Sequence, residues 1–444
     1  MLIMLSVGLA AIGVLMQLNR GRKLAMPGVL LAAVYPIVGA AGYIAYRYFH
    51  PPYIPSQAEV FYEPLRTSTL YSFFIAGVGV ACGTMLCALV SYQAGSDRRL
   101  EPLARIQTTV GQLSAGSLMV ASLLPAMLYV EGRGPSTLLS ADYYLQYTGP
   151  QWAAKIGFAL IPVGALVACV LARRSGATRL VGIAMVSIYI LVLVAAATRA
   201  LALVPLAWVA GGWLNSKSPK RRSLVIAAAL TLVLVNVPVV LRSEPMQGLI
   251  PFWHVIIATP GYVLVPNWGR TINNLLFSVP LANFVETTPV GLHAIFVSVD
   301  PLPGGSAGWS QISESLRVNL FTPFSAIGEV FSESPLLGFI YFSVTGFLIS
   351  YCWRSRPAQS GWAASVRSIV VLGVTVLFGA QSFEYNTRSV SRLIYYMLAL
   401  TIATAIVGGK TRGVAKVAAK TQSESQWQHA SEALSGVDRQ WQQL

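Results

Sequence analysis

Repeated apolar stretches of about 17–25 residues are the feature that most restricts what this chain can fold into. A helix rises by about 1.5 Å per residue, so a stretch of that length crosses a hydrocarbon core of about 30 Å. The chain of 444 residues is 55% hydrophobic and only 11% charged, whereas soluble domains carry about 25% charged residues. The sequence therefore predicts an all-α, polytopic integral membrane protein.

About eleven such spans are predicted, and the polar segments between them differ in charge. The spans are expected near residues 2–18, 26–46, 68–92, 108–129, 152–171, 180–197, 200–214, 223–241, 330–352, 364–381 and 393–408. Most of the 31 lysines and arginines fall at 19–25, 93–107, 172–179, 215–222, 353–367 and in the tail from 409. The positive-inside rule makes these segments cytoplasmic, so the N-terminus is expected outside and the C-terminus inside. Because the first apolar stretch has no basic segment before it, we interpret it as a retained helix rather than a signal peptide.

Residues 180–214 test this scheme, because they are apolar almost throughout. A single helix over this range would measure about 52 Å, which is too long for one span. It would also place the basic stretch "NSKSPKRR" outside. We therefore expect a break at Thr198 and Arg199, with Arg199 at the external membrane surface.

The predicted organisation has four parts. Residues 1–241 form helices one to eight, 242–329 form one large extracytoplasmic loop before the ninth helix, 330–408 form helices nine to eleven, and 409–444 form a cytoplasmic tail. Within the loop, "FWHVIIATPGYVLV" predicts a short interfacial or re-entrant helix. The net charge of +15 lies in short clusters between spans, a pattern typical of topology signals, so no nucleic-acid partner is expected. Cysteines, histidines and aspartates show no metal-ligand spacing, and no metal is expected.

Charged residues on the external side are the candidates for chemistry. Nine of the ten external basic residues are arginine, whose planar guanidinium suits phosphate and carboxylate recognition. The ten are Arg47, Arg66, Arg133, Lys155, Arg199, Arg242, Arg270, Arg317, Arg388 and Arg392. Arg199 lies between two apolar helices with no acid nearby in the sequence, which favours an external anion as its partner. The alternative is a hairpin tip that hydrogen-bonds to lipid headgroups.

The remaining candidates each have a structural alternative. Arg317 precedes the predicted ninth helix, and the acids that follow it, Glu329 and Glu333, could instead complement the positive end of that helix. Arg388 and Arg392 lie four residues apart, but they could reach for the membrane interface, or Arg388 could pair with Glu384 on one helix. His254 and His293 could each accept a proton at neutral pH, although a lone histidine is more often structural.

The stretch "TPFSAIGEVFSESPLLGFIYFSVTGFLISY", residues 322–351, resembles the O-antigen or oligosaccharide repeat-unit polymerases of the Wzy type, relatives of the O-antigen ligases. That family similarly re-enters the membrane after a large external loop through a polar stretch with a glycine and an acid. The hairpin "ATRALALVPLAW" resembles the family's arginine between adjacent helices. Arg317 and Gly328 match a spacing of arginine, ten residues and glycine that describes some members.

The resemblance implies a substrate, a reaction and a location. The substrates would be oligosaccharides linked to polyprenyl diphosphate in the outer leaflet of the bacterial inner membrane. The growing chain would pass from its lipid carrier to a new lipid-linked unit, catalysed by a metal-independent glycosyltransferase without a cofactor. Preorganised arginines stabilise a diphosphate leaving group, and the candidates are Arg199, Arg270, Arg317, Arg388 and Arg392. The candidate bases are His254, His293 and Glu329, while Gly328 would let the backbone approach the lipid head; membrane lipids and a chain-length regulator are the other expected partners.

Three rival functions differ in donor, acceptor or direction. A ligase-like enzyme would use the same donor with another acceptor. A lipid-sugar-dependent glycosyltransferase would use an acid in the first external loop, which here contains Glu59 and Glu63 but no aspartate. A flippase would favour internal symmetry and charges at the bilayer midplane, whereas these charges collect at helix ends.

Overall fold

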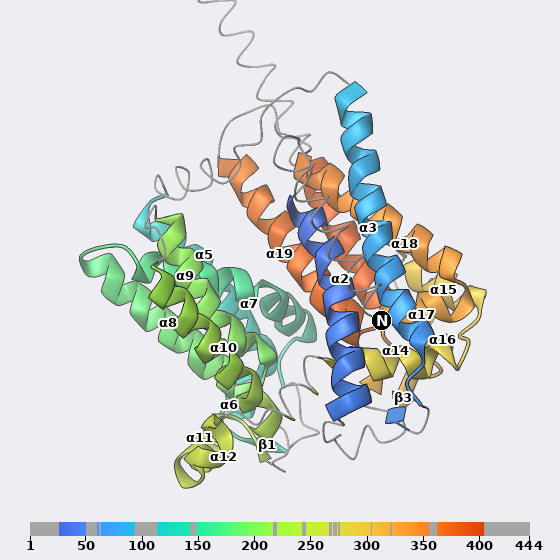
Figure 1. Cartoon of the computed structure of the whole chain (residues 1–444). Helices are drawn as coiled ribbons and strands as arrows, with labels where there is room; N and C mark the ends of the chain where they lie inside the picture. The colour runs from blue at the N-terminus through green and yellow to red at the C-terminus, as the bar shows by residue number, and fades with distance from the viewer. Residues whose placement is uncertain are drawn as a thin grey trace, which may run out of the picture.

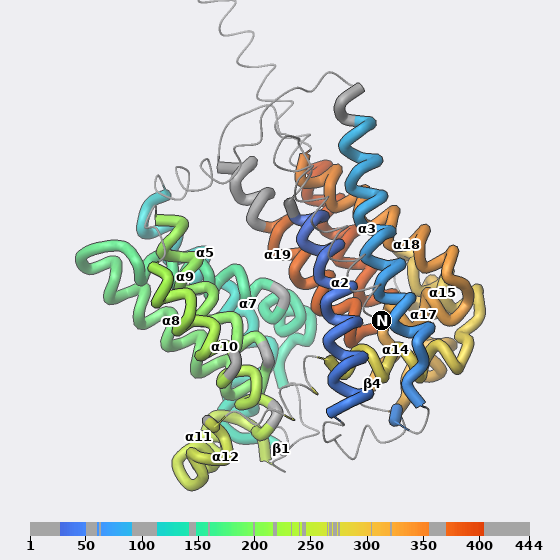
Figure 2. Tube along the Cα trace, viewed as in Figure 1, coloured from blue at the N-terminus to red at the C-terminus, as the bar shows by residue number. Residues whose placement is uncertain are grey.

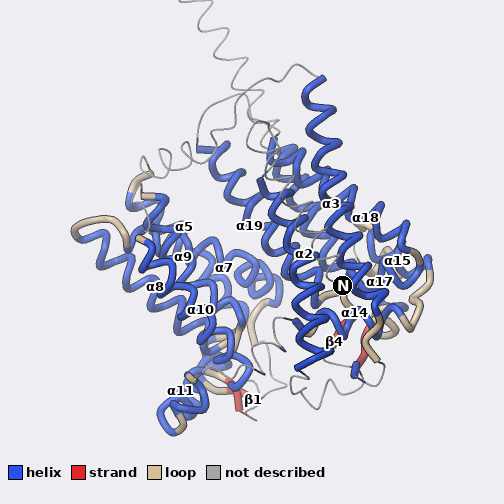
Figure 3. Tube along the Cα trace, viewed as in Figure 1, coloured by secondary structure: helices blue, strands red, loops and turns tan. Residues whose placement is uncertain are grey.

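The protein is described here by a computed structural model. It describes residues 26–49, 60–61, 64–93, 113–142, 148–215, 220–241, 246–265, 269, 273, 276–302, 304–319, 322–354 and 362–403. Helix accounts for most of these residues, and the strands are two short antiparallel pairs (Figure 3). The predicted all-α class is therefore confirmed for the described chain. The helices gather into two bundles (Figure 1).

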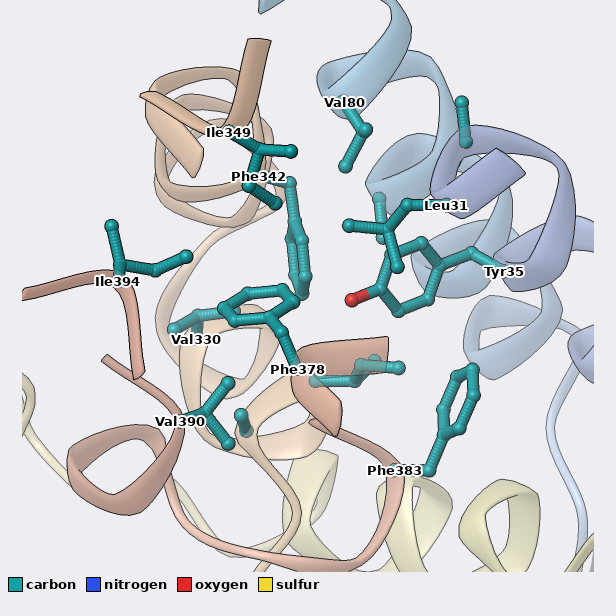
Figure 4. Packing of buried hydrophobic residues seen from close by; sticks show 14 of the residues in the cluster. Leu31, Tyr35, Val80, Val330, Phe342, Ile349, Phe378, Phe383, Val390 and Ile394 are labelled. Atoms are coloured by element: carbon teal, nitrogen blue, oxygen red, sulfur yellow. The ribbon is translucent and has the colours of Figure 1, made fainter. Parts of the chain in front are cut away.

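The first bundle joins the two ends of the described chain. Its elements are α2 (Met26–Ile44), a π-helical turn η1 (Ala45–Phe49), α3 (Thr67–Gln93), α14 (Ser278–Glu286), α15 (Leu292–Val299), α16 (Trp309–Ile312), β3 (Arg317–Asn319), β4 (Thr322–Pro323), α17 (Ala326–Glu333), α18 (Pro335–Arg354), α19 (Trp362–Glu384) and a last helix over 387–403. Figure 2 shows the blue N-terminal helices beside the orange and red C-terminal ones. Their shared core is aromatic: the ring of Tyr35 meets those of Phe342 and Phe383 edge-on, with centroids 5.0 and 5.3 Å apart (Figure 4).

The second bundle is formed by the middle of the chain, drawn in green in Figure 1. Its elements are α5 (Ala115–Arg133), α6 (Pro135–Leu139), β1 (Ala141–Asp142), α7 (Gln151–Ala172), α8 (Ala177–Ala195), a 3-10 helix η3 (Arg199–Leu203), α9 (Val204–Leu214), α10 (Arg221–Leu241), β2 (Met246–Gln247), α11 (Leu249–Ala258) and α12 (Pro260–Leu264). Tyr189, Leu193, Leu241 and Phe252 are buried in its core.

Helices in both bundles approach one another through glycines, as helices in membranes commonly do. In the first bundle, a side chain at Gly83 of α3 would lie 1.9 Å from the Ser343 carbonyl oxygen of α18. In the second, a side chain at Gly157 of α7 would lie 2.4 Å from the Tyr129 amide nitrogen of α5. Backbone contact, rather than the interlocking of large side chains, therefore sets the spacing of α3 with α18 and of α5 with α7.

Six described helices are long and apolar enough to cross a membrane, or seven if a bent pair counts as one span. The six are Pro27–Phe49, Thr67–Val90, Ala115–Arg133, Ala177–Ala195, Arg221–Pro238 and Pro335–Arg354, and the bent pair is Gln151–Phe158 with Leu160–Ala172, at 51°. The predicted span at 2–18 lies outside the described residues, and the one at 393–408 lies partly outside them. The spans predicted at 200–214 and 364–381 coincide with apolar helices, but neither meets the length test within the described side chains. A total of eleven spans thus stays a prediction.

The expected break near Thr198 is confirmed. Helix α8 ends at Ala195, Ala197 has a φ of 44°, and the Thr198 hydroxyl accepts the Ala200 amide hydrogen at the start of η3. The chain reverses direction there. A side chain added at Gly182 of α8 or at Gly211 of α9 would meet the same last turn of α7, so α8 leads away from that turn and α9 returns to it.

The stretch 242–329, predicted as one large loop, is divided between the bundles. Within its described residues, α11 and α12 pack on α8 and α10, whereas α14 packs on α2, α3, α17 and α19. The ninth helix was expected to begin near 330, and α18 begins at Pro335. Helix α17 ends at Glu333 and α18 begins at Pro335, because proline favours a first turn and the Ser334 hydroxyl accepts the Leu337 amide hydrogen.

Segments that the sequence placed outside do meet at one end of the first bundle. The Arg66 amide donates to Asn283, 2.8 Å away, and the Ala326 amide donates to the Tyr385 carbonyl at the same distance. At the opposite end, Arg354 donates to carbonyls of α3. The predicted external segments therefore lie at one end of the first bundle and the predicted cytoplasmic Arg354 at the other, as the topology requires. That this end faces outward remains a prediction.

Candidate functional site

Glu329 lies in α17 at the end of the first bundle where these loops meet. Ser325 begins the helix, and its hydroxyl oxygen accepts the Gly328 amide hydrogen at 3.1 Å. One turn later the Glu329 side chain is only 1% exposed. Its Oε2 accepts the Thr387 amide hydrogen at 2.8 Å. An acid in the first turn of α17 therefore caps a different helix, the one over 387–403.

That last helix has a second cap from its own sequence. The Oδ1 atom of Asn386 accepts the Ser389 amide hydrogen at 3.0 Å. The Glu329 carboxylate takes the amide hydrogen two residues earlier, at Thr387. Two of the unpaired amides at the helix start are thus satisfied, and the negative charge lies where the helix dipole favours it.

Burial makes Glu329 a weak acid. Removal from water raises the pKa of the Glu329 carboxyl to about 7, although the hydrogen bonds from Thr387 oppose the shift. Its other oxygen, Oε1, is buried without a hydrogen bond to any described residue. A carboxyl with a pKa near neutrality can hold or release a proton under physiological conditions.

Arg388 follows directly and is also buried, with 2% of its surface exposed. Its two terminal nitrogens donate to the carbonyls of Val297 and Leu302, at 2.5 and 2.6 Å. Its guanidinium carbon lies 5.2 Å from the centroid of the Trp309 ring, within the range of a cation–π interaction. Arg388 thus fastens the end of α15 and the following loop to the last helix. The Tyr395 hydroxyl, two turns further on, donates to Val299 in the same segment.

Both structural alternatives for Arg388 are wrong. A buried guanidinium bound to carbonyls does not reach for the membrane interface. An intrahelical pair with Glu384 is excluded because Glu384 ends α19, and residues 385–386 separate it from the next helix.

Arg392 lies one turn beyond Arg388 and completes a basic pair. Arg392 and Asp300 are both close enough to act electrostatically on Arg388. The Arg392 side chain is half-buried and makes no hydrogen bond within the described residues. Arg392, unlike Arg388, therefore has donors that no described residue occupies.

Arg317 and Gly328, which the sequence linked by spacing, have separate surroundings. Arg317 is exposed at the start of β3, opposite Pro323 of β4. A side chain at Gly328 would lie 2.7 Å from Val285 of α14. The expected close approach at Gly328 is therefore made by α14, and packing between helices accounts for the glycine.

The other predicted residues are scattered. His293 is exposed on α15, close in sequence to the carbonyls that hold Arg388, whereas His254 is exposed on α11 in the second bundle. The backbone of Arg199 begins η3, also in the second bundle, while its side chain and the whole of Arg270 lie outside the described part. The structure thus places Glu329 against the first turn of the helix that carries Arg388 and Arg392, whereas His254 lies in the other bundle.

A second, partly buried acid is Glu286 on α14, which was not among the predicted site residues. Its Oε2 accepts a hydrogen bond from the Thr69 hydroxyl at 3.3 Å, and burial raises its pKa. The neighbouring Asn283 accepts from the Arg66 amide and the Thr69 hydroxyl at the start of α3. These contacts secure the base of α3. Asp300, Trp309 and Tyr395, around Arg388, were also not among the predicted site residues.

No group of three or more histidine, cysteine, aspartate or glutamate side chains within the described residues is placed to hold a metal ion. The chain matches no known family model, no curated protein and no solved structure.

Proposed function

We propose that this protein polymerises oligosaccharide repeat units carried on polyprenyl diphosphate, at the external surface of a bacterial inner membrane. The observation that carries the proposal is the hydrogen bond from the Thr387 amide to Glu329, at the start of the helix that carries Arg388 and Arg392. A carboxyl with a pKa near 7 and an arginine pair lie where predicted external segments converge. The resemblance of residues 322–351 to repeat-unit polymerases covers α17 and most of α18, the helix that supplies Glu329 and the one that follows it.

The reaction needs charge stabilisation on one side and proton removal on the other. A hydroxyl oxygen of the acceptor sugar bonds to the anomeric carbon of the donor, and the bond from that carbon to the diphosphate oxygen breaks. The bonding pair leaves with the diphosphate, and the hydroxyl proton passes to a base. Arginines that face the developing negative charge lower the barrier without needing a metal.

The candidate residues suit different roles in this reaction. Arg392 and Arg317 have guanidinium groups without hydrogen bonds to described residues, so they are the first choices for contact with the diphosphate. Arg388 acts as a positioning residue, because carbonyls already occupy its terminal nitrogens. Of the candidate bases, His293 is exposed to an incoming sugar, whereas Glu329 is buried and needs a local opening to reach one.

The test is the length of surface glycan in a deletion strain complemented with single variants. The set is the wild type, Arg392→Ala, Arg392→Lys, Arg317→Ala and Arg199→Ala, with Arg179→Ala as the matched control. Arg179 is exposed in the first turn of α8, away from the candidate site. The proposal expects single capped units in the deletion strain and in Arg392→Ala, with long ladders in the control at equal membrane levels.

Two other outcomes identify different functions, and a third removes the support for the proposed site. Lipid-linked units that accumulate inside the cell indicate a flippase. Long chains that stay on the lipid carrier indicate a ligase. Full ladders in every variant would leave the arginines as topology signals and remove the support for an anion site.

A further inference from the structure

The outward face of α11 and α12 is apolar, although neither helix is long enough to cross a membrane. Ile250, Trp253 and Ile257 of α11 are 60%, 55% and 64% exposed. Their spacing of three and four residues places them on one side of the helix. Tyr262 of α12 and Val265 just after it are also exposed. At about 1.5 Å per residue, the ten residues of α11 span only about 15 Å.

This face belongs to a firmly held element. The opposite side of α11 buries Phe252 completely, and α12 buries Val263 completely, both in the core of the second bundle. The strand pair Ala141↔Gln247 ties the chain just before α11 to the loop after α6. These contacts fix the direction of the exposed face relative to the bundle. Figure 1 shows α11 and α12 at the lower end of the green helices.

The surface next to it is also apolar and belongs to α8, which is long enough to span a membrane, and to the shorter elements η3 and α9. Helix α11 packs on α8, and α12 packs on α10. At the same end of the bundle, Leu191 of α8, Leu203 of η3 and Leu206 of α9 are exposed. Exposed apolar side chains of the second bundle thus lie at the same end as the apolar face of α11.

The sequence of this segment offers a charged partner no carboxylate, ammonium or guanidinium group. No lysine, arginine, aspartate or glutamate occurs between residues 246 and 265. Tryptophan and tyrosine, the two exposed aromatics, are enriched where hydrocarbon meets headgroups. A face with these residues gains free energy by leaving water and needs no anionic lipid to do so.

We propose that α11 and α12 form an interfacial helix pair that lies flat in the headgroup layer of the bilayer, with Ile250, Trp253 and Ile257 in contact with lipid. The pair extends the membrane-facing surface of the second bundle sideways. Residues 246–265 are therefore assigned to the membrane domain and no longer to the predicted external loop. The proposal is independent of the reaction that the protein catalyses.

The test measures the depth of spin labels on the full-length protein in phosphatidylcholine vesicles. Single cysteines replace Ile250, Trp253 or Ile257 in a background where Cys82, Cys87, Cys169 and Cys352 are alanine. Leu230→Cys, exposed in the middle of α10, is the lipid control, and Ser310→Cys, exposed on α16, is the water control. Each variant is used only if it elutes as the wild type does.

The proposal expects the three α11 labels to collide often with oxygen and rarely with a water-soluble nickel chelate. All three should report one shallow depth, closer to the headgroups than the Leu230→Cys label. The result should not change when anionic lipid or salt is added.

Each alternative location of α11 gives a distinct reading that overturns the proposal. Nickel accessibility like that of Ser310→Cys places the face in water. Labels immobilised and shielded from both reagents indicate a protein that covers it, and dipolar broadening between labels identifies that protein as a second copy. A depth that changes steadily by about 10 Å from position 250 to 257 indicates a re-entrant helix.

Discussion

Glu329 and Thr387 are joined by a 2.8 Å hydrogen bond across 58 residues of chain, from a carboxylate on α17 to the first amide of the last helix. The next residue along that helix is Arg388, which holds the loop after α15 through its carbonyls. Three segments that are distant in sequence therefore depend on one buried carboxyl. The candidate site is assembled by this contact.

The first prediction separates two roles of Glu329, the hydrogen bond that caps the last helix and the negative charge of its carboxylate. Glu329→Ala leaves the Thr387 amide unpaired in a buried place, so the free energy of unfolding should fall by about 1–3 kcal/mol. Glu329→Gln keeps an acceptor oxygen in the same position and should unfold close to the wild type. Thermal unfolding in detergent, followed by tryptophan fluorescence, measures both. Glu314→Ala, at an exposed acid near the same end, is the control; a glutamine variant as unstable as the alanine one contradicts the capping role.

The second prediction concerns pH. The Glu329 pKa is about 7 in the folded protein and about 4.5 when unfolded, so between these values the folded state binds more protons. The free energy of unfolding should therefore fall as pH rises from about 4.5 to 7, by at most about 1.4 kcal/mol per pH unit, and level off above. Denaturant titration at constant ionic strength measures the slope. The difference between wild type and Glu329→Gln isolates this residue from others, including Glu286, and identical slopes in the two proteins would refute the assignment.

The third prediction concerns the guanidinium fork of Arg388. Lysine has the charge but not the planar fork, so Arg388→Lys cannot serve the Val297 and Leu302 carbonyls together. The free energy of unfolding should fall by about 2 kcal/mol. Amide hydrogen exchange over 297–302 should also quicken. Arg392→Lys is the matched control because Arg392 makes no hydrogen bond within the described residues. Unchanged exchange in Arg388→Lys shows that this loop is held by other contacts.

Local patterns in the sequence predicted the helices and the Thr198 break well. Apolar length and helix propensity act along the chain, so stretches such as Pro27–Phe49 and Pro335–Arg354 carry their own signal. The break at Thr198 was predicted because a single helix over 180–214 would be too long to cross the membrane once. The short helix α17 was not predicted as a separate element, because its residues from 330 on were assigned to the ninth span.

The contacts that build the site could not be predicted in the same way. Arg388 is bound by main-chain carbonyls, which every residue possesses, so no side chain in 297–302 marks that segment as its partner. Glu329 pairs with a backbone amide for the same reason. The assignment of 246–265 to one bundle and of 276–302 to the other depends on tertiary packing, which neither hydropathy nor charge records.

The last prediction tests the contact between α3 and α18, which brings the early and late parts of the chain together. Gly83→Ala would place a methyl carbon 1.9 Å from the Ser343 carbonyl oxygen, and Gly346→Ala would place one 2.3 Å from that of Val80. Both meet rigid backbone, so each helix must move away, at a cost of about 1–3 kcal/mol or more. Gly373→Ala on α19 is the control, because no described atom outside its own stretch of helix lies within 4 Å of the added carbon. Thermal unfolding in detergent should rank the control near the wild type and the two contact variants well below it. Equal midpoints for all three variants would mean that α3 and α18 do not touch through their backbones.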